Sequence, residues 1–213
     1  MKNKDNNRTL NPRREPSQER ARAKVEHILA VVRRILVEDG LEKLTTNYVA
    51  KQAEMSVGSL YRYFPNKQAI IYELYSRWLT ETRQELSRYD SDESNGKSPV
   101  EVLSSIAREM TDLWNNDDRP AYELELDKAM KLYPELQEMD RQHARKLATI
   151  MANIYRRLGV NLGIEELLQL GYFSYELYGV YWNLMSEGNC KPELIYQWLE
   201  RALLAVIEPH LEC

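Results

Sequence analysis

Four polar side chains in the segment 56–64 have the chemistry that a nucleic acid attracts: Ser59, Tyr61, Arg62 and Tyr63. A guanidinium such as that of Arg62 pairs with a phosphate or with the acceptor atoms of guanine. Tyrosine hydroxyls reach phosphate oxygens, and small residues let a protein backbone approach a duplex closely. The residue types in this segment therefore predict contact with DNA.

A helix is needed to hold these side chains on one face. At about 100° per residue, a helix that begins after Ser56 separates them from the apolar residues. One side then carries Val57, Leu60 and Phe64, the other carries Gly58, Ser59 and Arg62, and Tyr61 and Tyr63 lie on the flanks. A solvated helical hairpin whose tyrosines pack against their neighbours would show the same pattern, and the angles leave that alternative open.

A second short helix is predicted just before this one. Thr46 is placed to cap it, and the apolar residues between Val49 and Ala53 form its inner face. Ser56 caps the following helix, which Pro65 ends because proline disfavours helical geometry in the residue before it. Two short helices joined by a tight turn form a helix-turn-helix, which lays its second helix in the DNA major groove.

The segment 21–78 resembles the N-terminal domain of the TetR family of bacterial transcriptional regulators. The resemblance lies in Gly40-Leu41, Leu44-Thr45-Thr46, Val49-Ala50, the run from Ser56 to Phe64, and Asn66-Lys67. It implies DNA contacts from Thr46, Asn47, Val57, Gly58, Ser59, Tyr61, Arg62, Tyr63 and Lys67. The helical angles turn Val57 inward, whereas the resemblance places it at the DNA. The family usually has glycine where this chain has Glu54, so the turn is expected to be altered or strained by about 1 kcal/mol.

Charge is divided unevenly along the chain. Residues 1–88 contain 17 Lys and Arg against 11 Asp and Glu, a net charge of +6, whereas residues 89–213 carry −10. A basic end on an acidic body is the electrostatic pattern of a DNA-binding protein, although solvated faces also produce such an imbalance. Residues 1–17 are basic and unable to build a core, so we expect a disordered tail that either enters a minor groove or is inert.

Helical periodicity continues through the rest of the chain. Helices are predicted from Ser17 to Gly40, from the cap Asn66 toward Leu86, from the capping box Ser98–Glu101 to Trp114, and over 120–133, 134–158, 164–185 and 192–207. The polar segment 89–97 predicts a mobile connection. We therefore expect an all-α fold with a tail (1–17), a three-helix helix-turn-helix DNA-binding domain (18–66), a connecting helix (67–88) and a helical domain (89–213). The resemblance implies ligand binding and dimerisation for that last domain.

The last two predicted helices have more apolar surface than a domain of this size can cover. The helix 164–185 is apolar almost all round, interrupted at Gly171, Ser174, Glu176 and Gly179. We expect both helices to pair with their symmetry mates in a four-helix homodimer interface, with the glycines allowing close approach. A fully intramolecular core is the alternative. A homodimer would offer two recognition helices to the half-sites of a palindromic operator.

Aromatic and methionine residues of the C-terminal domain are candidates for an internal ligand site. Four tyrosines fall between Tyr172 and Tyr181, followed by Trp182, which favours a cavity or a dimer seam. The candidate lining residues are Met110, Trp114, Tyr122, His143, Met151, Tyr155, Tyr172, Tyr175 and Glu176. Each is also compatible with ordinary core packing. In the family that the chain resembles, a small molecule binds in this domain and the connecting helix swings, which changes the spacing of the DNA-binding domains.

Three classes of function follow: a ligand-responsive repressor, a DNA-bound adaptor of the same fold controlled by a protein partner, and a helical enzyme. The enzyme is disfavoured because the sequence has no glycine-rich phosphate loop, no metal-spaced cluster and no nucleophile with an accompanying base. No cofactor, metal or membrane partner is expected. The two cysteines, Cys190 and Cys213, lack disulfide or zinc spacing, and no signal peptide is visible, so we expect a cytoplasmic, nucleoid-associated regulator with an unknown small-molecule effector.

Overall fold

The computed structural model describes residues 16–91, 96–112, 119–186 and 190–211. Within these ranges the chain is helical, and the β-type pairing is limited to an isolated antiparallel bridge between Val160 and Leu211. The expectation of an all-α fold is confirmed. Residues 1–15 of the expected tail, residues 92–95 of the expected connection and Trp114 lie outside the described residues.

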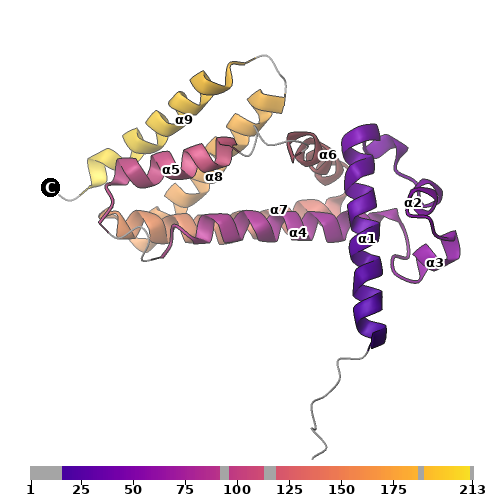
Figure 1. Cartoon of the computed structure of the whole chain (residues 1–213). Coiled ribbons are helices and arrows are strands. Elements are labelled where there is room, and N and C mark those ends of the chain that lie inside the picture. The colour runs from indigo at the N-terminus through magenta and orange to yellow at the C-terminus, as the bar shows by residue number, and fades with distance from the viewer. Residues whose placement is uncertain (1–15, 92–95, 113–118, 187–189, 212–213) are drawn as a thin grey trace, which may run out of the picture.

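Three helices and one short 3₁₀ segment form the N-terminal part, here called the head. They are α1 (Pro16–Asp39), η1 (Leu41–Lys43), α2 (Thr46–Gln52) and α3 (Val57–Tyr61). A long helix, α4 (Lys67–Ser87), runs from the head into the second part, here called the body (Figure 1). The body consists of α5 (Pro99–Asp112), α6 (Arg119–Leu132), α7 (Pro134–Arg157), α8 (Ile164–Ser186), α9 (Pro192–Ile207) and η4 (Glu208–His210).

Several helix ends are set by the capping residues that the sequence predicts. The Asn66 side chain accepts a hydrogen bond of 2.8 Å from the backbone N–H of Ala69 at the start of α4. Before α5, Ser98 and Glu101 form a reciprocal capping box, with backbone N–H bonds of 3.2 Å to the Ser98 hydroxyl and 2.7 Å to the Glu101 carboxylate. Such local bonds satisfy donors that the first helical turn leaves unpaired.

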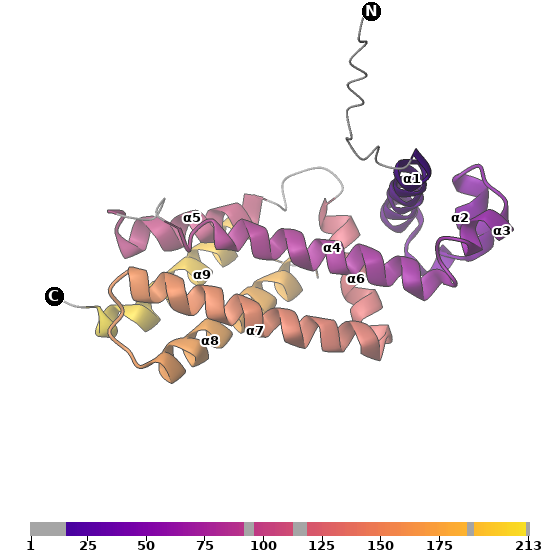
Figure 2. The same ribbon diagram turned by 90° about the horizontal axis from the view of Figure 1, so that it is seen from below.

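Two hydrophobic cores lie along the molecule. The first is formed by the head and the first part of α4, and it also takes Leu126 of α6 and Leu136 of α7. The second is formed by α5, α7, α8 and α9, and it takes Leu86 from the end of α4. Helix α4 therefore contributes to both cores, and in Figure 2 it runs beside α7 through the body. Because α4 and α6 both pack against the head, a displacement of either helix in the body also changes its contacts with the head.

The packing of α7 against α8 depends on one glycine. A Cβ atom on Gly171 would lie only 2.3 Å from the carbonyl oxygen of Ala148, so no larger residue fits this crossing. From the sequence, Gly171 and Gly179 are expected to allow close approach between subunits. For Gly171 this is corrected, because its close neighbour is α7 of the same chain; a Cβ on Gly179 would meet nothing within 4 Å.

Because α8 is largely apolar, the helices can be compared with the requirements for a membrane-spanning segment. Among the described residues, no helix combines the length and the hydropathy that crossing a membrane requires.

Candidate nucleic-acid interface and internal cavity

Helix α3, the predicted recognition helix, begins where the sequence predicts. The Ser56 hydroxyl accepts a hydrogen bond of 3.1 Å from the backbone N–H of Ser59, and the two hydroxyls lie 2.8 Å apart. The helix ends at Tyr61, earlier than the expected end near Phe64, whose side chain is buried in the head core. A single helical turn thus carries the exposed face.

Helix α2 begins one residue earlier than expected. Thr45, not Thr46, is its N-cap, and the Thr45 hydroxyl accepts a bond of 3.2 Å from the backbone N–H of Tyr48. This correction leaves the Thr46 hydroxyl on the surface, where it lies 3.3 Å from the hydroxyl of Tyr61 on α3. The first turn of α2 and the last turn of α3 therefore share one polar surface, and the exposed side chain of Asn47 adjoins it in sequence.

The remaining residues assigned to DNA contact are not equally accessible. Tyr61 is 49% exposed, Arg62 is exposed, and Gly58 has open space where a side chain would stand. Val57 and Tyr63 are half-buried and pack against the head core, which agrees with the inward angle calculated for Val57.

The ninth assigned residue, Lys67, lies at the first turn of α4. It is half-buried, and its ammonium group lies 3.4 Å from the backbone oxygen of Leu44. The lysine therefore contacts the segment that precedes α2.

The turn between α2 and α3 contains the departure noted in the sequence. Glu54 has φ +51°, the left-handed conformation that glycine adopts without strain. The backbone N–H of Met55 donates to Ala50 across 3.0 Å, which closes the turn. The expected strain at Glu54 is therefore present, and the hydrogen-bonded turn keeps α3 at its angle to α2.

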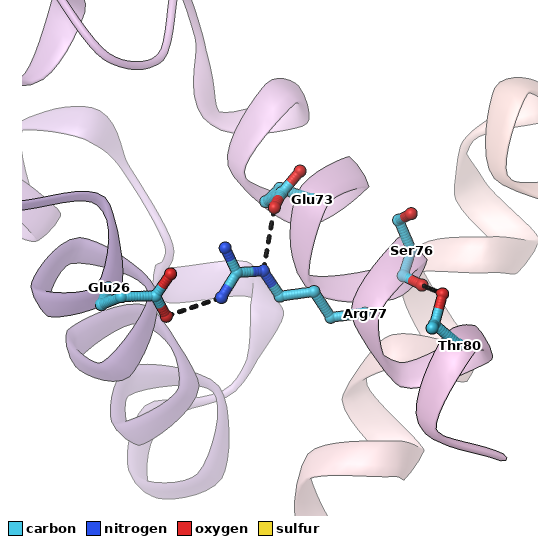
Figure 3. Close-up of polar contacts among 5 residues, drawn as sticks. All are labelled: Glu26, Glu73, Ser76, Arg77 and Thr80. Atoms are coloured by element: carbon cyan, nitrogen blue, oxygen red, sulfur yellow. Dashed lines mark hydrogen bonds and ion pairs between the residues drawn. The ribbon is translucent and has the colours of Figure 1, made fainter. Parts of the chain in front are cut away.

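Helix α1 holds this motif and connects it to α4. The Tyr48 hydroxyl donates to the Asp39 carboxylate across 2.8 Å, and this bond lowers the pKa of Asp39. On the other side of α1, the guanidinium of Arg77 lies between Glu26 of α1, at 2.6 Å, and Glu73 of α4, at 2.8 Å (Figure 3). The ion pair with Glu26 joins the connecting helix directly to the head.

A cavity of about 370 Å³ lies in the body, lined by residues of α4, α5, α6, α7 and α8. Its wall contains carboxylates held by aromatic donors. The Asp140 carboxylate accepts from the hydroxyls of Tyr75, at 2.9 Å, and Tyr175, at 3.2 Å. The indole N–H of Trp78 donates to Glu123 across 2.9 Å. Volumes of this size hold small organic molecules in proteins.

Two polar atoms at the cavity wall have no hydrogen-bond partner among the described residues: Nδ1 of His143 and the hydroxyl of Tyr178. His143 is only 4% exposed. Burial, with smaller contributions from the nearby charges of Arg83 and Lys146, lowers its pKa to about 4, so the imidazole is neutral at pH 7. Buried polar atoms without partners are uncommon, and a bound molecule would satisfy them.

The head matches a known family. The sequence profile described as "Bacterial regulatory proteins, tetR family" matches residues 28–74. Residues 28–74 therefore belong to a TetR-family domain. The match covers α2, α3 and their supports in α1 and α4, which confirms the resemblance found in the sequence.

Comparison with individual known proteins gives further similarities. The HTH-type transcriptional repressor KstR of Rhodococcus jostii is 36% identical over 77 residues, which are 33% of this chain and 33% of that protein. The match thus spans a third of the length of this relative. Among solved structures, a TetR-family regulator from Mesorhizobium loti has a TM-score of 0.71 at 13% identity, covering 88% of this chain and 98% of the other. One from Streptomyces coelicolor has a TM-score of 0.69 at 16% identity, covering 91% and 97%. These two show that the fold of head and body is shared.

The body places only some of the candidate ligand residues at the cavity. His143, Met151, Tyr175 and Glu176 line it. Three others do not: Tyr122 lies under the Arg33 guanidinium, Tyr155 bonds Ser174 across 2.5 Å, and Tyr172 is exposed on α8. The Met110 side chain and Trp114 lie outside the described residues.

Two carboxylates of the cavity, those of Glu123 and Asp140, are absent from the residues predicted from the sequence. Glu123 and Asp140 stand in amphipathic helices, where an acidic residue predicts only a solvated face. A signal did exist for Glu123, because it follows Tyr122 on the apolar side of its helix, and it is only 5% exposed. Among the described residues, no group of His, Cys, Asp and Glu side chains is arranged to hold a metal ion.

Proposed function

We propose that this chain is a TetR-family transcriptional repressor that binds a palindromic operator as a homodimer and is released by a small-molecule effector. The observation that carries the DNA-binding part is the exposed polar surface where Thr46 of α2 meets Tyr61 and Arg62 of α3. The relative named as a transcriptional repressor is similar to this chain at a level of 36% identity over 77 residues, which supports regulation rather than catalysis. Such a protein would act beside the nucleoid in the cytoplasm.

Exposed apolar side chains on α8 and α9 support the homodimer. The exposed fractions of Phe173 and Val180 on α8 and of Trp198 on α9 are 47%, 54% and 56%. Monomeric proteins seldom leave a set of large apolar residues in water on adjacent helices. Pairing α8 and α9 with their symmetry mates would cover them and would place two α3 helices on one side of the dimer.

The cavity supports control by a small molecule over the alternative, control by a protein partner. Helices α4 and α6 line the cavity, and both also contact the head. A ligand that fits the cavity better in one arrangement of these helices shifts the distance between the two heads of a dimer. The affinity for operator can fall only by the ratio of the ligand's affinities for the two arrangements.

DNA selection tests the proposal. Genomic fragments retained by the purified chain are sequenced, and a shared palindrome is then used in a mobility-shift assay at fixed salt concentration. We expect a complex with two chains per palindrome and a much weaker complex with a single half-site. Retention of fragments with no shared sequence, or a complex of one chain per site, would contradict specific binding as a dimer.

A further inference from the structure

The cavity in the body changes from polar to apolar along α7. The residues of α7 that line it follow one another at spacings of three and four, which places them on one face of the helix: Asp140, His143, Leu147 and Met151. The first two are polar, whereas Leu147 and Met151 belong to the second hydrophobic core. Leu86 of α4 and Ile106 of α5 also line the cavity and belong to the same core. A ligand that fits this cavity therefore has a polar end and an apolar body.

Two carboxylates of the lining already have partners in the chain. One oxygen of Asp140 accepts from the hydroxyl of Tyr75, and the other accepts from that of Tyr175. An oxygen of Glu123 accepts from the indole N–H of Trp78, and Glu123 takes part in a further interaction within the chain. Hydrogen bonds to an ionised carboxylate stabilise its charge. Neither carboxylate therefore requires a positive charge on the ligand.

The other charges at the cavity are also compensated. The ammonium group of Lys131 pairs with Asp127 across 2.6 Å, and Glu176 is exposed to solvent. Positive charge acts on the wall as well, because the charges of Arg83 and Lys146 add to the effect of burial in lowering the pKa of His143. Charges of both signs thus act on the cavity, so the lining selects neither an organic cation nor an organic anion.

Two neutral groups at the cavity wall have no hydrogen-bond partner among the described residues, Nδ1 of His143 and the hydroxyl of Tyr178. Tyr178 packs against the second core, so of the two only His143 lies toward the polar end of the cavity. Its imidazole is buried and uncharged at pH 7, because burial lowers its pKa to about 4. Nδ1 of a neutral imidazole either donates or accepts, according to which nitrogen holds the proton. A hydroxyl group can do both, so it satisfies Nδ1 in either form.

We propose that the effector of this cavity is an uncharged, mainly apolar compound with a hydroxyl group, which bonds Nδ1 of His143 while the apolar body lies against Leu147 and Met151. The inference rests on the proposed regulatory function and names the ligand class for the same cavity. A purely apolar ligand would leave Nδ1 without a partner. A charged ligand would lose its hydration among groups whose own charges are already compensated.

Four naphthalene probes of similar size test the ligand class by equilibrium dialysis against the full chain at pH 7. They are the neutral alcohol 2-naphthol, the unsubstituted naphthalene, the anion 2-naphthoate and the cation 2-naphthylmethylammonium. We expect 2-naphthol to bind about fivefold more tightly than naphthalene, as one hydrogen bond predicts, and to bind more tightly than either charged probe. This ranking is measured on the unmodified chain, so it does not depend on the folding of any variant.

Variants then locate the hydroxyl group of the ligand. His143→Phe keeps a ring without a hydrogen-bonding atom, so it should weaken 2-naphthol about fivefold and leave the affinity for naphthalene nearly unchanged. Tyr178→Phe removes the other unpartnered atom and should reduce the preference for 2-naphthol less than His143→Phe does. The matched control His210→Phe makes the same change at an exposed histidine outside the cavity lining and should change neither affinity. Circular dichroism verifies that each variant is folded.

The outcomes separate the ligand class from the regulatory function. If naphthalene or a charged probe binds as tightly as 2-naphthol, or if no probe binds, the proposal is overturned whatever the head does with DNA. A preference for 2-naphthol that persists in His143→Phe, or that Tyr178→Phe reduces more, also overturns it, because the hydroxyl then binds elsewhere. If only His143→Phe abolishes the preference, the ligand class stands. If 2-naphthol then fails to release operator DNA in a mobility-shift assay, regulation by this cavity is wrong while the ligand class still holds.

Discussion

The carboxylate of Glu125 on α6 accepts a hydrogen bond of 2.6 Å from the backbone N–H of Leu41, at the start of η1 in the head. Its other oxygen pairs with the ammonium group of Lys128 across 2.5 Å. Two residues earlier on the same helix, Glu123 lines the cavity. Helix α6 therefore contacts both the cavity and the segment before α2, so a shift of α6 reaches the head without passing through α4.

Removal of this carboxylate should loosen the joint between body and head. Glu125 is buried, and Glu125→Ala leaves the Leu41 N–H without its partner, which lowers the free energy of unfolding by about 1–3 kcal/mol. Urea denaturation measures the change. The control Glu138→Ala removes an exposed carboxylate that forms a surface ion pair with Arg141 and accepts a hydrogen bond from Gln142, and it should change stability by less than about 1 kcal/mol. Equal effects from both variants would show that the Leu41 bond contributes nothing.

Arg62→Ala and Tyr61→Phe test the polar surface of the head. Arg62→Ala should weaken operator binding by about 1–3 kcal/mol if the guanidinium contacts a base. If it contacts a phosphate instead, the slope of log K against log salt concentration should become shallower by about one. Tyr61→Phe removes one hydroxyl from an exposed site and should weaken binding less. Fluorescence anisotropy at several salt concentrations gives both quantities. Helix content and elution volume should match the parent chain, and unchanged DNA affinity would place the interface elsewhere.

Two glycines of α8 offer a matched pair for packing. Gly171→Ala places a methyl group against the Ala148 carbonyl, where a Cβ would lie 2.3 Å away, so α7 and α8 must separate. We expect a loss of about 1–3 kcal/mol or more in the free energy of unfolding. Gly179→Ala meets nothing within 4 Å and should raise stability by about 0.5–1 kcal/mol, because alanine restricts the unfolded chain. In thermal denaturation, the midpoint temperature should therefore fall for Gly171→Ala and rise for Gly179→Ala relative to the parent chain.

Residues that act within one turn could be predicted from the sequence, whereas residues that meet across the fold could not. Ser56, Asn66 and the Ser98–Glu101 box were predicted because a cap bonds a backbone group two or three positions away. Thr45 was missed in favour of its neighbour, since two adjacent threonines have equal capping chemistry.

The long-range contacts carry no comparable signal. Asp140 meets Tyr75 from 65 positions away, and Glu125 meets Leu41 from 84. Their approach depends on how α6 and α7 cross α4, which periodicity does not encode. For the same reason, the sequence indicated that aromatic residues of α8 form part of a ligand site and gave no indication of the carboxylates opposite them.

Glu54 offers a test of strain in the recognition turn. Because its φ of +51° lies in the left-handed region, Glu54→Gly relieves about 1 kcal/mol of strain, offset in part by the greater freedom of glycine in the unfolded chain. Glu54→Val introduces a β-branched residue that tolerates this conformation poorly, and it should destabilise the head. In chemical denaturation followed by circular dichroism, the free energy of unfolding should be highest for the glycine variant, intermediate for the parent chain and lowest for the valine variant. The reverse order would show that another interaction of Glu54 outweighs its backbone conformation.

The buried imidazole of His143 should make stability depend on pH in a defined window. Its pKa is about 4 in the folded chain against 6.5 in the unfolded chain, so between these values the unfolded state binds one more proton. The stability that the neutral His143 contributes to the free energy of unfolding is fully present above pH 6.5. It decreases by about 1.4 kcal/mol per pH unit as the pH falls from 6.5, and it is lost by about pH 4. His143→Asn does not titrate, so the difference in unfolding free energy between parent and variant should change across this window and stay constant from pH 7 to 8. Parallel curves from pH 4 to 7 would mean that the pKa of His143 is the same in the folded and unfolded chains, so that burial does not lower it.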